Sequence, residues 1–255
     1  MALNSTERQI YDEYIRNRFE GAEESSLSGE DSLEIWEKII DYGLFLGFDK
    51  AINAKICPDR PVEFEDPEKI NIRLYDSFAG RIPVISLGNE KDFEQLVTNV
   101  AYGGVRPDNL SDTGASFIHG KTVRFIIISD KPYSNIPAKE IGLSDEEWHE
   151  KSALIRLEHE CTHFFTKKTY GITNNILHDE IIADFTGIYE AFGIYRAELF
   201  LRFMGIIKGS GNRFAFYTNG LSENVKSELM SLSRDVACNL EKWSSTDAFL
   251  SMSKA

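Results

Sequence analysis

Residues 144–171 read SDEEWHEKSALIRLEHECTHFFTKKTYG. Ser144 and Glu147 have the spacing of a capping box, in which each side chain accepts a hydrogen bond from the other residue's backbone, and this marks a helix start. Gly171 is a typical helix stop, because glycine adopts the left-handed conformation without strain. We therefore predict one long helix that begins after Ser144 and runs through Lys168.

This helix carries two histidines four residues apart, His159 and His163, with Glu160 directly after the first. Positions four apart on an α-helix differ by only about 40° in direction, so both imidazoles project from one face and converge on one ion. Glu160 lies next to that face, where its carboxylate reaches a water at the metal rather than the metal itself. The pattern predicts Zn2+ bound by His159 and His163, with Glu160 as general base.

The opposite side of the helix is apolar, which indicates that it packs on a core. Its residues are Leu154, Leu157, Cys161, Phe164 and Phe165. Cys161 points away from the histidines in this projection, so we expect it to be a small buried residue and not a ligand.

A second helix follows, with Asn174 and Asn175 as its expected cap and an end at Gly193 or as far on as about Ile207. One side has the small residues Ala183, Gly187 and Ala191, which let another backbone approach closely. A separate apolar stripe of Ile181, Phe185, Ile188 and Phe192 faces the core.

Zinc in a hydrolase takes three protein ligands and a water, so a third ligand is expected nearby. Glu180 lies on the small-residue face of the second helix and is the expected third ligand. Asp184, four residues later on that face, is expected to accept a hydrogen bond from the far nitrogen of a ligand histidine. His178 is an alternative third ligand, and Asp184 or no third ligand are the remaining alternatives.

These motifs resemble the gluzincin class of zinc metallopeptidases, which have a thermolysin-like arrangement. In that class a glutamate on a second helix completes the site, and an aspartate four residues later orients the first histidine. Glu180-Ile-Ile-Ala-Asp184 matches this order. The chain is also similar to small uncharacterised bacterial proteins that contain a His-Glu-x-x-His helix. The resemblance extends over residues 144–207 and implies hydrolysis of peptide or protein substrates.

Hydrolysis of an amide benefits from a donor aimed at the developing oxyanion, which in zinc enzymes is usually Tyr, His or Arg. Tyr217 follows the glycine-rich turn after both predicted metal helices and is the leading candidate. Tyr195 and Arg213 are the alternatives.

Strand patterns precede these helices. Residues 70–78 and 81–88 are rich in β-branched and aromatic residues and predict a hairpin. Residues 122–129 predict a buried strand, which either belongs to the core or offers an edge to an extended peptide. Helices are predicted over about 32–48 and 92–102.

The expected fold class is α+β. Residues 1–31 are predicted to form an N-terminal helical arm, with its helix ending near Phe19, and a linker. Residues 32–255 are predicted to form a single metallopeptidase-like domain. It divides into a lobe with a small mixed β-sheet over 32–137 and a helical zinc lobe over 138–255.

The net charge of the chain and the spacing of its cysteines indicate which binding partners and which cellular compartment to expect. The formal net charge of −13 disfavours binding to nucleic-acid phosphates and anionic membranes. The chain has no basic-then-apolar leader and no run of about 18 apolar residues. Cys57, Cys161 and Cys238 are widely spaced, which is typical of reduced thiols. We predict a cytoplasmic protein with a peptide or protein substrate and no nucleic-acid or membrane partner.

Two other functions fit the motif. One is a zinc amidohydrolase that acts on a non-peptide substrate, but a deformylase-like site needs a cysteine ligand shortly before the helix, and Cys57 is remote. The other is a non-catalytic, zinc-stabilised binding or regulatory protein. Glu160 argues against the second, because a purely structural zinc needs no general base.

Overall fold

The computed structural model describes residues 3–17, 19–20, 33–119, 124–171, 177–208, 211–247 and 249. Within these segments one mixed sheet has the strand order β1-β2-β4-β3. Its strands are β1 (Ile70–Ser77), β2 (Gly80–Leu87), β3 (Ala115–His119) and β4 (Arg124–Ser129).

The predicted hairpin is confirmed: β1 and β2 pair antiparallel, and the turn residue Gly80 has a φ of 112°. The predicted strand over 122–129 is β4, described from Arg124 onward, and it pairs parallel with β2 and antiparallel with β3. β4 is buried and has a partner on each side, so the core alternative is confirmed and the edge alternative is wrong. The edge strands are β1 and β3, and no sequence pattern predicted β3.

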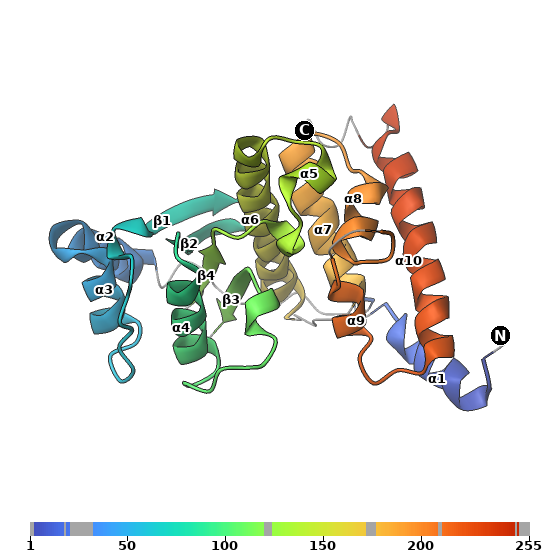
Figure 1. Cartoon of the computed structure of the whole chain (residues 1–255), viewed down its shortest axis with the longest axis horizontal. Helices are drawn as coiled ribbons and strands as arrows, with labels where there is room; N and C mark the ends of the chain where they lie inside the picture. Colours follow the sequence, from blue (N-terminus) through green and yellow to red (C-terminus); the bar gives the residue numbers. More distant parts are fainter. Residues whose placement is uncertain are drawn as a thin grey trace.

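Side chains of the sheet alternate between two cores. Ile85 and Leu87 of β2 join one core, against α2 (Leu33–Leu46), α3 (Phe48–Lys55) and α4 (Glu90–Ala101). Ile82 and Val84 of the same strand join the other core, against α6 (Asp145–Tyr170). The sheet therefore separates three N-terminal helices from the long helix that carries His159 and His163 (Figure 1).

The ends of α6 are as predicted. Ser144 and Glu147 form the capping box, and Gly171 ends the helix with a φ of 69°. Leu157, Cys161 and Phe164 pack on the sheet. The predicted apolar side is thus confirmed for these three residues and Phe165, including the buried position of Cys161, whereas Leu154 packs in the C-terminal core instead.

The opposite side of α6 packs on α7 (Leu177–Phe192). A Cβ at Gly187 would lie 2.6 Å from the carbonyl oxygen of Ile155, so the two backbones touch here as the small residues predicted. The helix stops at Phe192, where Gly193 has a φ of 68°, and does not continue to Ile207. The expected cap residues 174 and 175 lie outside the described residues.

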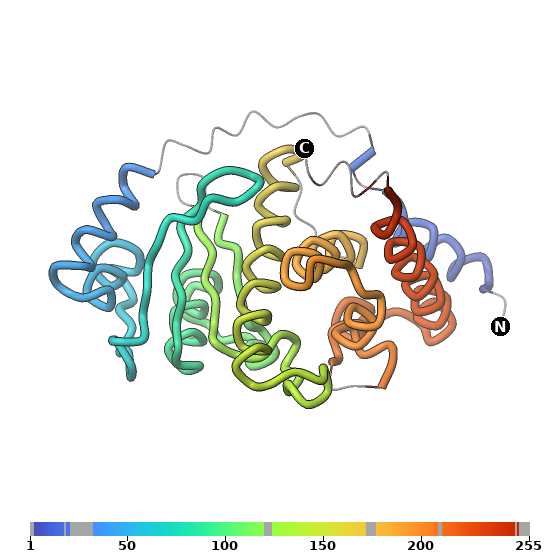
Figure 2. The backbone as a smooth tube through the Cα atoms, turned by 90° about the horizontal axis from the view of Figure 1, so that it is seen from above, coloured from blue at the N-terminus to red at the C-terminus, as the bar shows by residue number. Residues whose placement is uncertain are grey.

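The remaining C-terminal elements are α5 (Ala138–Ile141), α8 (Ala197–Phe203), α9 (Arg213–Tyr217) and α10 (Glu223–Ser244). Three 3-10 turns are η1 (Pro67–Lys69), η2 (Leu110–Asp112) and η3 (Tyr133–Asn135). In Figure 2 the sheet and α10 lie far apart, with α6 and α7 between them. The predicted α+β class, with an N-terminal sheet and C-terminal helices, is confirmed.

The N-terminal helix α1 (Ser5–Tyr14) lies beside α10, at the end of the molecule away from the sheet (Figures 1 and 2). The Tyr14 hydroxyl donates a hydrogen bond of 2.7 Å to the backbone oxygen of Tyr217. The helix ends before Phe19, and the predicted linker over residues 21–31 lies outside the described residues. Among the helices that are described, none has the length and apolar character needed to cross a membrane.

Candidate metal centre and its cleft

Three side chains from α6 and α7 converge on one point. Nε2 of His159 lies 3.1 Å from Nε2 of His163. The two oxygens of Glu180 lie 3.3 Å and 3.5 Å from these nitrogens, respectively. Four ligands placed tetrahedrally at zinc bond lengths of about 2.0–2.1 Å are separated by about 3.3–3.4 Å. The three donors therefore fit three corners of a tetrahedron around one ion.

The far nitrogens of both histidines are held by carboxylates of α7. Nδ1 of His159 lies 2.8 Å from Asp184, and Nδ1 of His163 lies 3.1 Å from Asp179. Each histidine thus donates through Nδ1 and directs Nε2 toward Glu180, which is the usual arrangement of metal-binding histidines. With both Nδ1 atoms hydrogen-bonded to carboxylates, the two Nε2 atoms and Glu180 fit a metal ion.

A second network surrounds the carboxylates. The Tyr133 hydroxyl, from η3, donates to Asp184 and lies 3.0 Å from Nδ1 of His159. Arg213, from α9, places Nη1 3.0 Å from both oxygens of Asp184 and donates through Nη2 to Glu180. Two segments outside α6 and α7 therefore fix the orientation of the candidate ligands.

The buried histidines and carboxylates of the site shift one another's pKa values. Burial alone would lower the pKa of His163, but the carboxylates of Asp179 and Glu180 hold it well above its ordinary value. Burial alone would raise the pKa of Glu180, but the histidines and Arg213 hold it well below its usual range. At neutral pH the metal-free site consequently combines an ionised glutamate with histidines that retain protons readily.

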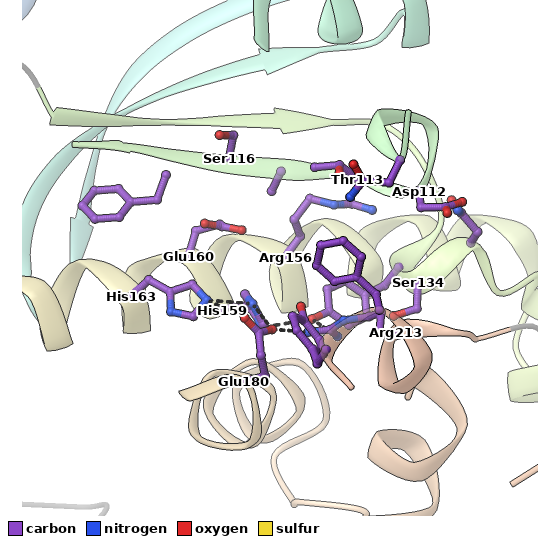
Figure 3. A pocket seen from close by; sticks show the side chains of 18 of the residues that line it. Asp112, Thr113, Ser116, Ser134, Arg156, His159, Glu160, His163, Glu180 and Arg213 are labelled. Atoms are coloured by element: carbon purple, nitrogen blue, oxygen red, sulfur yellow. Dashed lines mark hydrogen bonds and ion pairs between the residues drawn. The ribbon is translucent and has the colours of Figure 1, made fainter. Parts of the chain in front are cut away.

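Glu160 differs from its neighbours. Its carboxylate makes no hydrogen bond or ion pair with another described residue, although the residue is only 9% exposed. Figure 3 shows Glu160 on the side of α6 that faces β3, while His159 and His163 turn toward Glu180. The carboxylate is therefore available to a molecule that enters beside the metal site.

The site opens into a cleft with a volume of ≈ 450 Å³. Its walls come from β3, η3, α6, α7 and α9, and they include His159, Glu160, His163 and Glu180. Tyr217 and Arg213 also line this cleft, beside Glu180. Burial and the charge of Glu180 raise the pKa of the Tyr217 phenol, so its hydroxyl remains protonated.

Two alternative candidates lie elsewhere. Tyr195 is fully buried in the core, where its ring contacts Phe185, and it does not line the cleft. His178 lies next to Phe19, with ring centroids 5.4 Å apart, and is not part of the metal-ligand cluster in the described chain. Of the predicted third ligands, Glu180 is the one that meets both histidines.

Sequence reasoning missed Asp179 and Tyr133, and it considered Arg213 only as an oxyanion donor. Asp179 had a usable signal: two helices joined by a short connection run antiparallel, so the later histidine of α6 faces the earlier acid of α7. The contacts of Tyr133 and Arg213 link segments far apart in the chain, and no local pattern indicates them.

Comparison with known proteins identifies a family for this chain. No curated protein and no solved structure matches the chain. The family described as "Family of unknown function (DUF7005)" matches residues 50–124 and 122–253. Since this match spans most of the chain, the protein belongs to the family of unknown function DUF7005.

Proposed function

We propose that this protein is a zinc-dependent hydrolase that cleaves peptide bonds, with His159, His163 and Glu180 as the metal ligands. The donor set supports this assignment, because two imidazoles and one carboxylate are a common ligand set of catalytic zinc. A zinc ion held there supplies a Lewis acid that polarises a carbonyl and lowers the pKa of water.

Glu160 is the general base in this proposal. It accepts a proton from the attacking water and passes it to the amine that leaves. The single observation that carries the proposal is its carboxylate, which lies beside the ligands, faces the cleft and is bound to no other described residue. A closed structural zinc site has no use for such a group.

Tyr217 and Arg213 lie beside Glu180 and line the same cleft. A protonated phenol and a guanidinium are both donors, so they stabilise negative charge that develops on a substrate carbonyl oxygen. Arg213 also binds Glu180 and Asp184, and the Tyr217 hydroxyl has side-chain hydrogen bonds to Glu180 and Arg213, so both donors are held beside Glu180. Tyr217 remains the leading candidate.

The edge strand β3 supports an extended peptide as the substrate. Ala115, Ser116 and Phe117 line the cleft, and among the described strands β3 pairs with β4 alone. A peptide that adds to the free side of an edge strand receives backbone hydrogen bonds along its length. Glu160 faces β3 in Figure 3, so a peptide held along β3 lies next to the Glu160 carboxylate.

The cytoplasm is the proposed compartment. Cys57, Cys161 and Cys238 are all free thiols in the described chain, which supports a reducing environment. The net charge of −13 supports a peptide partner over nucleic acid.

The test compares zinc-loaded wild type with zinc-loaded Glu160→Gln on a mixed peptide library, with newly formed amino termini as the readout. We expect cleavage by wild type and a loss of about 100-fold or more in the variant, because general-base catalysis contributes about 10²–10⁴-fold. Zinc content should be equal in both proteins. Equal cleavage by both proteins, or no cleavage by zinc-loaded wild type, would contradict the proposal.

A further inference from the structure

Arg156 lies one helical turn before Glu160 on α6 and lines the same cleft. It is only 3% exposed. In Figure 3 its side chain extends from α6 toward Thr113, on the side where Glu160 also projects. A buried guanidinium is therefore part of the cleft wall beside the candidate catalytic group.

Arg156 makes its hydrogen bonds to backbone oxygens, and the negative charges of Glu160 and Asp130 act on it without forming an ion pair. Nη1 donates a hydrogen bond of 3.0 Å to the carbonyl oxygen of Ser129, and Nη2 donates one of 2.6 Å to the carbonyl oxygen of Lys131. The ring of Tyr133 lies 5.9 Å from its Cζ. No carboxylate of a described residue forms an ion pair with it. Burial lowers the pKa of Arg156 to about 10, so the group remains charged at neutral pH.

The two backbone hydrogen bonds of Arg156 do not require a charged donor. Neutral donors would satisfy the two carbonyl oxygens, whereas burying an unpaired ion is expensive in free energy. Arg213, the other guanidinium that lines the cleft, is partly buried and has two carboxylate partners. The unpaired cation points to an anion that arrives with a ligand.

Gly114 lies close to the Nε–Nη2 edge of the guanidinium and has no side chain to crowd it. A Cβ at this residue would lie 2.7 Å from Nε and 2.9 Å from Nη2 of Arg156, so any other residue type would cover that edge. Gly114 also lines the cleft. Arginine binds carboxylates through such an edge with two parallel hydrogen bonds.

We infer that Arg156 binds a substrate carboxylate and makes the cleft selective for peptides with an acidic side chain or a free C-terminus near the cleaved bond. This inference rests on the proposed function. One helical turn rises about 5.4 Å and one extended residue spans about 3.3–3.6 Å. The carboxylate thus belongs to a residue within about two positions of that bond.

The test measures binding and cleavage of matched peptide pools. One pool contains Asp and Glu, and a second replaces them with Asn and Gln; each is made with a free and with an amidated C-terminus. Binding is measured by fluorescence anisotropy on zinc-loaded Glu160→Gln, and cleavage on zinc-loaded wild type. We expect the acidic form to bind about 10- to 100-fold more tightly, the usual effect of a hydrogen bond to a charged group. If the Asn and Gln pool loses the preference, the bound carboxylate is that of a peptide side chain. If amidation of the peptides removes it, the bound carboxylate is the C-terminus.

Two further variants assign the preference to Arg156. Arg156→Met in the Glu160→Gln protein should bind charged and neutral pools equally. Gly114→Ala should weaken the preference while the charge remains, because its Cβ covers the guanidinium edge. Arg81→Met, which removes an exposed arginine paired with Asp76, is the control and should keep the full preference. Zinc content checks that each variant is folded.

The outcomes separate this inference from the proposed function. Equal binding and equal cleavage of all pools by proteins with Arg156 would overturn the inference and leave the hydrolase standing. Acid-selective binding without cleavage by wild type would support the inference and contradict the hydrolase. A preference that survives in both Arg156→Met and Gly114→Ala would overturn the assignment to Arg156, and no binding of any pool would overturn both proposals.

Discussion

Arg213 donates a hydrogen bond from Nη2 to Glu180, the carboxylate that completes the candidate metal site. The same guanidinium reaches both oxygens of Asp184 through Nη1. A cation from α9 therefore neutralises two buried carboxylates of α7, and the metal site depends on a segment that contributes no ligand of its own.

Arg213→Met should destabilise the metal-free protein by about 3–5 kcal/mol, because it leaves Glu180 and Asp184 buried without their cation. Added zinc should recover part of this loss, since the ion supplies positive charge to Glu180. Thermal unfolding with and without zinc measures both effects. Arg106→Met, which removes an ion pair on the surface, is the control and should cost less than about 1 kcal/mol. Equal losses in the two variants would contradict the role of Arg213.

Asp179→Asn and Asp184→Asn should each weaken zinc binding by about 10- to 100-fold, because each aspartate fixes the orientation of one ligand histidine. Competition with a chromogenic chelator measures the affinity. Asp130→Asn is a suitable control, since Asp130 is exposed and pairs with the surface residue His149. If Asp179→Asn bound zinc as tightly as the control, the contact with His163 would have no function in metal binding.

Zinc binding should release protons at neutral pH. Carboxylates raise the pKa of His159 and His163 against the effect of burial, so the metal-free histidines hold protons at a pH where free histidine is largely neutral. The ion requires unprotonated Nε2 atoms, so zinc affinity should fall as the pH falls. Calorimetric titration in buffers of different ionisation enthalpy measures the protons released. A binding enthalpy independent of the buffer would refute this prediction.

Gly187→Ala should lower the free energy of unfolding by about 1–3 kcal/mol, because the new Cβ would lie 2.6 Å from the Ile155 carbonyl oxygen and force α6 and α7 apart. It should also weaken zinc binding, since the ligands come from both helices. Gly88→Ala is a matched control, because the nearest atoms to its Cβ would be side-chain atoms of Lys69, at 3.0 Å or more, and not backbone. Denaturant unfolding and zinc titration of both variants give the comparison.

Local patterns predicted much of the site. The capping box at Ser144 and the stop at Gly171 depend on residues close in sequence, and both are present in the structure. The two faces of α7 follow from helical spacing alone, and Glu180 accordingly lies beside the histidines. Where a motif lies inside one helix, the geometry of that helix determines which side chains meet.

Other features depend on contacts between distant segments. Strand β3 is five residues long and follows a stretch rich in turn residues, so its pattern is too short to indicate a strand. Its place at the sheet edge depends on pairing with β4. Tyr133 and Asp184 are 51 residues apart, and the hydrogen bond between them follows from the packing of η3 against α7. No spacing rule predicts such a contact.

The metal content of the purified protein tests the central claim most directly. Elemental analysis should find about one zinc per chain in wild type and in Glu160→Gln, since a catalytic site binds one ion through its three ligands. Zinc should be lost in His163→Ala and reduced in Glu180→Ala. Absence of zinc from wild type, even after reconstitution with excess metal, would contradict the account and leave His159, His163 and Glu180 as a buried hydrogen-bonded cluster.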